Sequence, residues 1–142
     1  MGALTRFVRN ARSGRLQKTL SATAAASALP LAFEVYLEHY KGAFGDKWEW
    51  MPLWCTPPIV AAGVAGYFSE RAARTALPAA SALYALNGIV GTVLHGRGVQ
   101  RKPGGFSEPT YNLVMGPPLL APGSFTLIGG LGMLAAVMKR ER

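Results

Sequence analysis

The stretch Pro109–Met138, PTYNLVMGPPLLAPGSFTLIGGLGMLAAVM, runs for 30 residues without a charged side chain. A helix of about 20 apolar residues is long enough to cross a lipid bilayer. In a soluble fold, by contrast, charged residues recur every few positions on the outward face of a helix. Trp50–Ser69 and Thr75–Gly96 are two further uncharged stretches of sufficient length. The sequence therefore predicts an all-α integral membrane protein.

A fourth apolar stretch, Thr19–Phe33, is shorter and is bounded by Lys18 and Glu34. Counting its polar ends, we expect four transmembrane helices, near residues 17–40, 52–70, 75–95 and 117–138. They form a single domain over residues 15–142, which follows a basic N-terminal segment over residues 1–14. A three-crossing arrangement is the alternative, because Arg97, Arg101 and Lys102 place three basic residues in a short outer loop, against the usual charge bias.

The net charge of +8 is distributed unevenly between the two expected sides of the membrane. Ten basic residues fall on one side: Arg6, Arg9, Arg12, Arg15, Lys18, Arg71, Arg74, Lys139, Arg140 and Arg142. The other side receives five, together with five of the seven acidic residues. Cytoplasmic loops carry the excess of lysine and arginine. We therefore expect both termini on the cytoplasmic side, and the basic charge gives no reason to expect nucleic acid binding.

The first 33 residues contain no acidic side chain and are rich in arginine, serine and alanine. This composition is compatible with a mitochondrial presequence, and a cleaved secretory signal is a further alternative. A bacterial inner membrane is the predicted location, with the mitochondrial inner membrane as the alternative. Because Leu4, Phe7 and Val8 lie among arginines, residues 1–15 are expected either to rest on an anionic inner leaflet or to form a disordered basic tail.

The outer ends of the first and third crossings carry the residues that suggest a ligand site. Glu34 and Glu38 are four residues apart and share one helix face, while Asn87 and His95 lie on one stripe of the third crossing. If these two helices pack together, Glu34, Glu38, His95 and the deeper Asn87 form a ligand or proton site. Carboxylate and imidazole groups suit both proton exchange and metal binding.

The corresponding metal-ligand set is Glu34, Glu38, His39 and His95. A haem held between His39 and His95 is a weaker cofactor alternative, since two histidines are its only marker. The alternative without a ligand site is that these side chains lie at the solvated ends of helices in the headgroup region. Separately, Arg97, Arg101 and Lys102 lie among four glycines in the loop His95–Gly105, a composition that suits contact with lipid phosphate or another anion.

Small residues recur in every crossing, among them Gly63 with Gly66, Gly88 with Gly91, and the group Gly129, Gly130 and Gly132. Such residues permit close approach of membrane helices. Cys55 is the only cysteine, and no nucleophile, base and orienting group can be nominated together. The leading prediction is therefore a non-catalytic accessory or structural subunit of a larger membrane complex, with membrane-protein partners or a second copy. A small transporter or a ligand- or metal-binding membrane protein is the alternative.

Overall fold

The computed structural model describes residues 2–140, apart from the side chain of Ala11, and every regular element in that part is helical. The long helices are α1 (Ala3–Ser13), α2 (Arg15–Lys41), α3 (Met51–Phe68), α5 (Ala76–Gln100) and α7 (Leu120–Val137). Shorter helices connect them: η1 (Lys47–Trp50), α4 (Glu70–Arg74), η2 (Gly105–Ser107) and α6 (Pro109–Val114). The predicted all-α class is confirmed.

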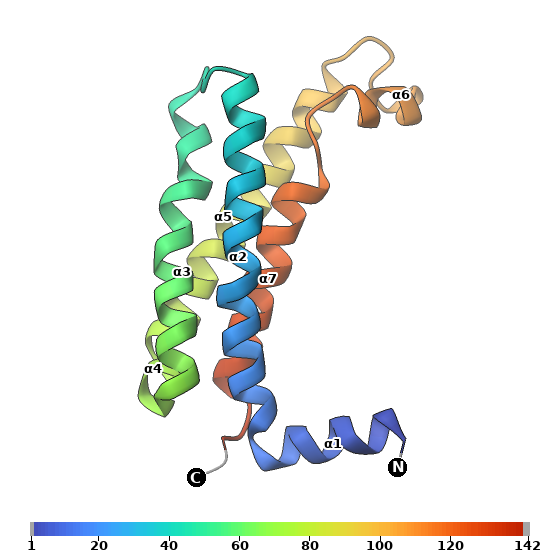
Figure 1. The fold of residues 1–142 in the computed structure, drawn as a ribbon. Coiled ribbons are helices and arrows are strands. Elements are labelled where there is room, and N and C mark those ends of the chain that lie inside the picture. The colour runs from blue at the N-terminus through green and yellow to red at the C-terminus, as the bar shows by residue number, and fades with distance from the viewer. Residues whose placement is uncertain (1, 141–142) are drawn as a thin grey trace.

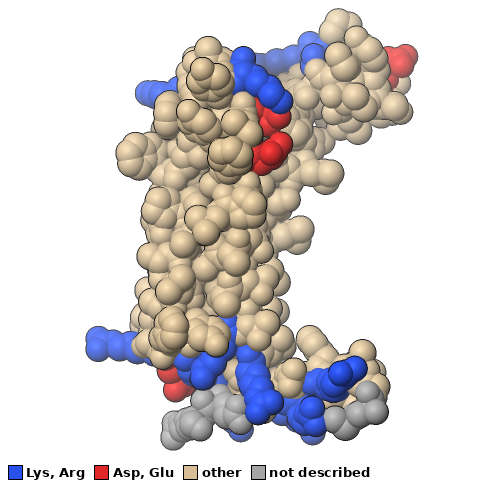
Figure 2. All heavy atoms as spheres, in the orientation of Figure 1, with Lys and Arg blue, Asp and Glu red and all other residues tan. Residues whose placement is uncertain are grey.

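Three helices of the described chain are long and apolar enough to cross a membrane: Arg15–Lys41, Glu70–Gln100 and Leu120–Val137. α3 is also free of charge but contains Pro52, Pro57 and Pro58, and it is not among the three. Figure 2 shows basic and acidic atoms gathered at the two ends of the visible face, with an uncharged band between them. This distribution is that of a multi-pass membrane protein.

α2, α3, α5 and α7 form a four-helix bundle in which consecutive helices run in opposite directions (Figure 1). α2 packs against α3 and α7, and α5 packs against the same two helices. α2 and α5 therefore occupy diagonal corners. The first and last described residues, Gly2 and Arg140, lie at one end of the bundle, here called the terminal end, and α1 runs across this end rather than along the bundle (Figure 1). The opposite end is called the far end.

Two helix boundaries differ from the predicted ones, and both lie next to proline residues. The third crossing was expected to end near residue 95, whereas α5 continues to Gln100, and the first proline after it is Pro103. The fourth was expected from residue 117, whereas α7 begins at Leu120, after Pro117 and Pro118. Proline lacks a backbone N–H and disfavours helix in the residue before it, so the paired prolines delay the start of α7.

Glycines allow the helices to approach each other backbone to backbone, as their spacing predicts. A Cβ atom added at Gly129 of α7 would lie 2.5 Å from the carbonyl oxygen of Ser81 in α5. One added at Gly88 would lie 2.5 Å from the amide nitrogen of Thr126, and one at Gly63 of α3 would lie 2.7 Å from the carbonyl oxygen of Ser21. Real Cβ atoms do not occupy such positions. The α5–α7 and α2–α3 contacts therefore require these glycines.

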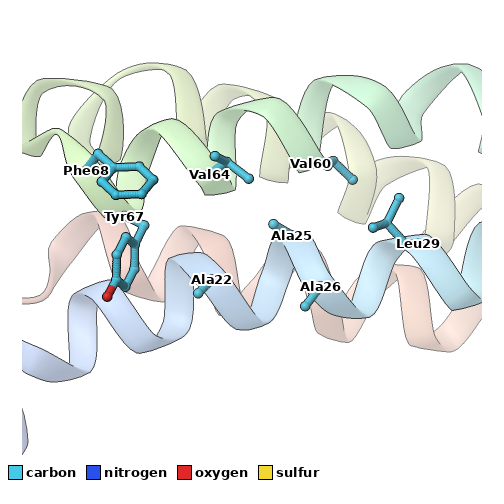
Figure 3. A pocket seen from close by; sticks show the side chains of 8 residues that line it. All are labelled: Ala22, Ala25, Ala26, Leu29, Val60, Val64, Tyr67 and Phe68. Carbon is cyan, nitrogen blue, oxygen red and sulfur yellow. The ribbon is translucent and has the colours of Figure 1, made fainter.

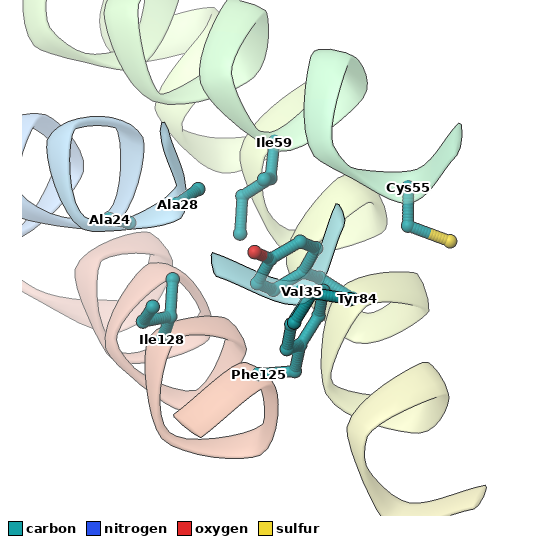
Figure 4. Packing of buried hydrophobic residues seen from close by; sticks show 8 residues of the cluster. All are labelled: Ala24, Ala28, Val35, Cys55, Ile59, Tyr84, Phe125 and Ile128. Carbon is teal, nitrogen blue, oxygen red and sulfur yellow. The ribbon is translucent and has the colours of Figure 1, made fainter. Parts of the chain in front are cut away.

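The bundle core is built around an aromatic pair (Figure 4). The rings of Tyr84 in α5 and Phe125 in α7 stack at a centroid distance of 4.4 Å and an interplanar angle of 24°. Ile59 of α3 and Ala28 of α2 pack in the same buried cluster. All four long helices of the bundle thus contribute to one core, whose side chains are fully or almost fully buried.

The segment between α5 and α7 is organised by Asn112, which is 1% exposed. Its side-chain Nδ2 donates to the carbonyl oxygens of Pro103 at 2.9 Å and Gly105 at 2.7 Å. Gly104 adopts the left-handed region, with φ of 79°, which glycine reaches without steric strain. Because one buried amide satisfies two backbone carbonyls, this far-end segment is an ordered substructure.

Candidate functional site

The two predicted carboxylates lie at the far end of α2 on its outer surface. Glu34 is exposed, and Glu38 pairs with Lys41 at 2.5 Å on the same helix. The side chains of Lys41 and Glu38 are 71% and 36% exposed, so solvent screens the ion pair and it adds little to stability. Glu34 lies one turn closer to the middle of the bundle, directly after the apolar stretch Thr19–Phe33. Its side chain is exposed and does not enter the bundle core.

The two histidines are held by backbone carbonyls at the far end. Nδ1 of His39 lies 2.7 Å from the carbonyl oxygen of Glu49, which ties the end of α2 to η1. Nδ1 of His95 lies 2.6 Å from the carbonyl oxygen of Pro118, which ties α5 to the segment before α7. Because a carbonyl oxygen only accepts, Nδ1–H of each ring is the donor in its contact. Both rings therefore fasten a loop to a helix.

The expected convergence of Glu34 and Glu38 with His95 required contact between α2 and α5. These helices lie diagonally in the bundle, each separated from the other by α3 and α7. Within residues 2–140, no group of three or more histidine, cysteine, aspartate or glutamate side chains is placed to hold a metal ion. Asn87 is half-buried on α5. The structure thus places Glu34, Glu38 and His39 at the end of α2 and His95 on α5, two helices that are not neighbours in the bundle.

The predicted anion-contact residues lie where α5 ends. Arg97 and Arg101 are exposed and are one helical turn apart, and Lys102 is half-buried. The carbonyl of Arg97 accepts the backbone N–H of Arg101 at 3.1 Å, so α5 keeps both residues on one face. These cations lie at the end of an apolar helix. Contact of these cations with lipid phosphate or another anion stays a prediction.

Sequence reasoning missed a polar network at the terminal end of the bundle. Gln17 of α2 is fully buried, and its Nε2 donates to the carbonyl oxygens of Ala135 at 3.0 Å and Met138 at 3.3 Å. Nη1 of Arg140 donates to Oε1 of Gln17 at 3.3 Å and to the carbonyl of Gly66 at 2.6 Å. The signal available in the sequence was the neutral polar residue Gln17, which lies in helical register with the small residues of α2.

Arg140 also closes the end of α3, because its Nη2 donates to the carbonyl of Tyr67 at 2.6 Å. The last carbonyls of a helix have no partner within the helix and carry a partial negative charge. A guanidinium group satisfies two of them and at the same time joins α3 to α2 through Gln17. The network therefore locks together three helices at the terminal end.

We predict that Arg140→Ala lowers the free energy of unfolding by about 2 kcal/mol, the usual contribution of hydrogen bonds from a charged donor. Lys139→Ala is the matched control, because it removes the same charge from the adjacent exposed position. The measurement is thermal or denaturant unfolding of purified protein in mild detergent. Equal stability of the two variants would contradict a role for the Arg140 hydrogen bonds.

An apolar groove of about 320 Å³ runs between α2 and α3 (Figure 3). Its lining consists of alanines and larger apolar side chains from the two helices: Ala22, Ala25, Ala26, Leu29, Val60, Val64, Tyr67 and Phe68. Figure 3 shows Tyr67 and Phe68 at one end and Leu29 and Val60 at the other. The groove presents almost no polar surface. It is therefore suited to apolar chains.

A second apolar surface, here called the α7 outer face, consists of Leu120, Gly123, Leu127, Gly130, Leu134 and Val137. These positions fall on one side of the helix, since residues seven apart return to nearly the same direction. Leu120, Leu127 and Val137 are 85%, 72% and 77% exposed. A Cβ atom added at Gly123 or Gly130 would meet nothing within 4 Å. The face thus combines protruding leucines with open glycines, both repeating every seven residues.

Comparison with known proteins found no matching family model, no matching curated protein and no matching solved structure.

Proposed function

We propose that this chain is a non-catalytic accessory or structural subunit of a larger membrane complex. The observation that carries the proposal is the α7 outer face. Glycine within a helix is less favourable than alanine by about 1 kcal/mol, and a surface that only contacts lipid has no need of it. Glycines that permit a neighbouring helix to approach closely are typical of transmembrane helix interfaces.

The arrangement of large and small residues on the α7 outer face further supports docking of a helix. Leucines at positions 120, 127 and 134 alternate with glycines at 123 and 130. A seven-residue repeat keeps one face of a helix against its partner along the full length of a left-handed helix pair. Side chains of each helix then pack into spaces between side chains of the other, as in a coiled coil. The partner expected on this face is a transmembrane helix of another subunit.

The directions of the helices support four crossings. α2 leads from the terminal end to the far end, and α5 begins at the terminal end (Figure 1). If α2, α5 and α7 cross the bilayer, the chain returns across it through α3, which packs along both α2 and α5. This arrangement supports four crossings rather than three.

The charge distribution supports placing both termini in the cytoplasm. Nine basic residues of the described chain belong to the segments at the terminal end, and lysine and arginine accumulate on the cytoplasmic side. A bacterial inner membrane is the proposed location. In the alternative, a mitochondrial inner membrane, the same end faces the matrix.

The test is affinity purification of the tagged chain from its native membrane in mild detergent, with mass spectrometry of the proteins that co-purify. We expect other membrane proteins in fixed ratio. The double variant Gly123→Leu, Gly130→Leu should lower their recovery at least about tenfold, equivalent to roughly 1.4 kcal/mol of binding free energy. Ala79→Leu is the control, because it enlarges an exposed small residue on α5 instead.

Two outcomes would contradict the proposal. A solitary, monodisperse chain would show that no stable partner exists, and recovery of a second copy alone would make the protein a homo-oligomer. Equal partner recovery from the double variant and Ala79→Leu would instead remove the α7 outer face as the binding surface.

A further inference from the structure

α1 leaves the bundle at the terminal end and does not pack along its side (Figure 1). Gly14, the residue between α1 and α2, has φ of 82° in the left-handed region, which ends α1 and redirects the chain. α2 begins at the next residue and continues into the apolar span. α1 is thus an ordered helix joined by a single glycine at the level where the apolar span begins.

The two faces of α1 differ in chemistry. Successive residues of a helix are about 100° apart, which places Leu4, Phe7 and Val8 on one side and Arg6 and Arg9 on the other. Leu4 is 75% exposed and Phe7 is 57% exposed, so the bundle covers neither. An amphipathic helix with basic residues opposite aromatic and aliphatic ones suits the plane of a membrane surface.

The charge at this end decides the kind of surface that α1 fits. α1 has no acidic residue, and the residues around it at the terminal end are predominantly basic (Figure 2). Arginines attract anionic lipid headgroups over a distance of about one Debye length. A zwitterionic surface offers the apolar side chains the same burial but no net attraction for the arginines.

We propose that α1 lies on the membrane at the terminal end, with Leu4, Phe7 and Val8 among the acyl chains and its arginines against the phosphates of anionic phospholipids. The inference rests on the membrane placement proposed above. It adds a ligand class that the subunit proposal does not require. Its consequence is that the position of α1 depends on the anionic lipid content of the leaflet.

The experiment uses variants that carry one new cysteine in a Cys55→Ala background. Each variant is labelled with an environment-sensitive fluorophore, and the labelled protein is reconstituted into vesicles. Phe7→Cys reports the apolar face, and Thr5→Cys reports the opposite face two residues away. In vesicles of phosphatidylcholine with phosphatidylglycerol, the emission of the Phe7 label should shift to the blue, and the Thr5 label should remain water-exposed. In phosphatidylcholine alone, the shift of the Phe7 label should be smaller. Replacing Arg6, Arg9 and Arg12 by glutamine should weaken docking about fivefold per arginine.

Trypsin digestion of the unmodified chain in the same vesicles gives a second measurement that does not depend on the cysteine variants. Anionic vesicles should slow cleavage after Arg9, whereas neutral vesicles should not. Equal emission from the two labels in anionic vesicles, or emission independent of lipid charge, would overturn the proposal. The proposal would also be overturned if the Phe7 label were shielded in native membranes but water-exposed in anionic vesicles, because another protein of the native membrane would then cover α1.

Failure of the membrane placement is distinguishable from failure of the proposal for α1. A chain that does not span the bilayer will not float with vesicles of either composition after salt and alkaline washing. A chain that floats with both but keeps its Phe7 label in water spans the membrane without docking α1.

Discussion

Gly129→Ala is expected to lower the free energy of unfolding by about 3 kcal/mol, at the upper end of the usual cost of overpacking a core. The new Cβ atom would lie 2.5 Å from the carbonyl oxygen of Ser81 and 2.7 Å from the amide nitrogen of Ala85. Both are backbone atoms, so no side chain can rotate to make room. α5 and α7 would have to separate along the contact, and the stacked rings of Tyr84 and Phe125 lie in that same interface.

Gly130→Ala supplies the matched control from the adjacent residue. A Cβ atom there meets nothing within 4 Å, and alanine favours helix over glycine by up to about 1 kcal/mol. The two substitutions are chemically identical, yet their effects on stability should have opposite signs. Thermal unfolding of the purified variants in mild detergent measures both. A loss of stability in Gly130→Ala equal to that in Gly129→Ala would show that α7 faces α5 with a different side.

The contrast between Gly129 and Gly130 also marks how far the sequence predicts the fold. The uncharged stretches located the helices, and small residues at helical spacing predicted close packing, which is confirmed at Gly63, Gly88, Gly129 and Gly132. Which of two adjacent glycines faces inward was beyond prediction. In a membrane, the lipid side and the packed side of a helix are both apolar, so hydrophobic periodicity does not give its orientation.

The pairing of helices was also beyond the reach of periodicity. The ligand-site hypothesis needed Glu34 of the first crossing beside His95 of the third, whereas α2 and α5 lie diagonally. Contact between distant segments is set by shape complementarity along whole helices, and single polar residues do not encode it. Conversely, Gln17 and Asn112 gained their roles from carbonyls brought together only by the fold. Single-sequence patterns therefore located the elements and left their partners undetermined.

Tyr84 is expected to show the largest side-chain effect in the bundle. The residue is completely buried, its ring stacks on Phe125 at 4.4 Å, and its cluster includes side chains from all four helices of the bundle. Truncating a buried aromatic ring to alanine typically costs about 3–5 kcal/mol, because the transfer free energy is lost and a cavity remains. Tyr84→Ala should therefore lower the free energy of unfolding by about that amount, which is a large part of the stability of a typical domain.

Tyr84→Phe separates the contribution of the ring from that of the hydroxyl group. Within the described residues, the Tyr84 hydroxyl oxygen is buried without a hydrogen-bond partner, and an unsatisfied buried polar group is unfavourable by about 1–3 kcal/mol. Phenylalanine keeps the ring and its stacking while removing that group, so the variant should be as stable as the unmodified chain or more stable. Unfolding of both variants in the same detergent gives the comparison. A clear loss of stability in Tyr84→Phe would contradict this account, because it would mean that the hydroxyl group has a hydrogen-bond partner in the membrane-embedded protein. The neighbouring Thr56 hydroxyl group is the candidate for that partner, because it is buried beside Tyr84.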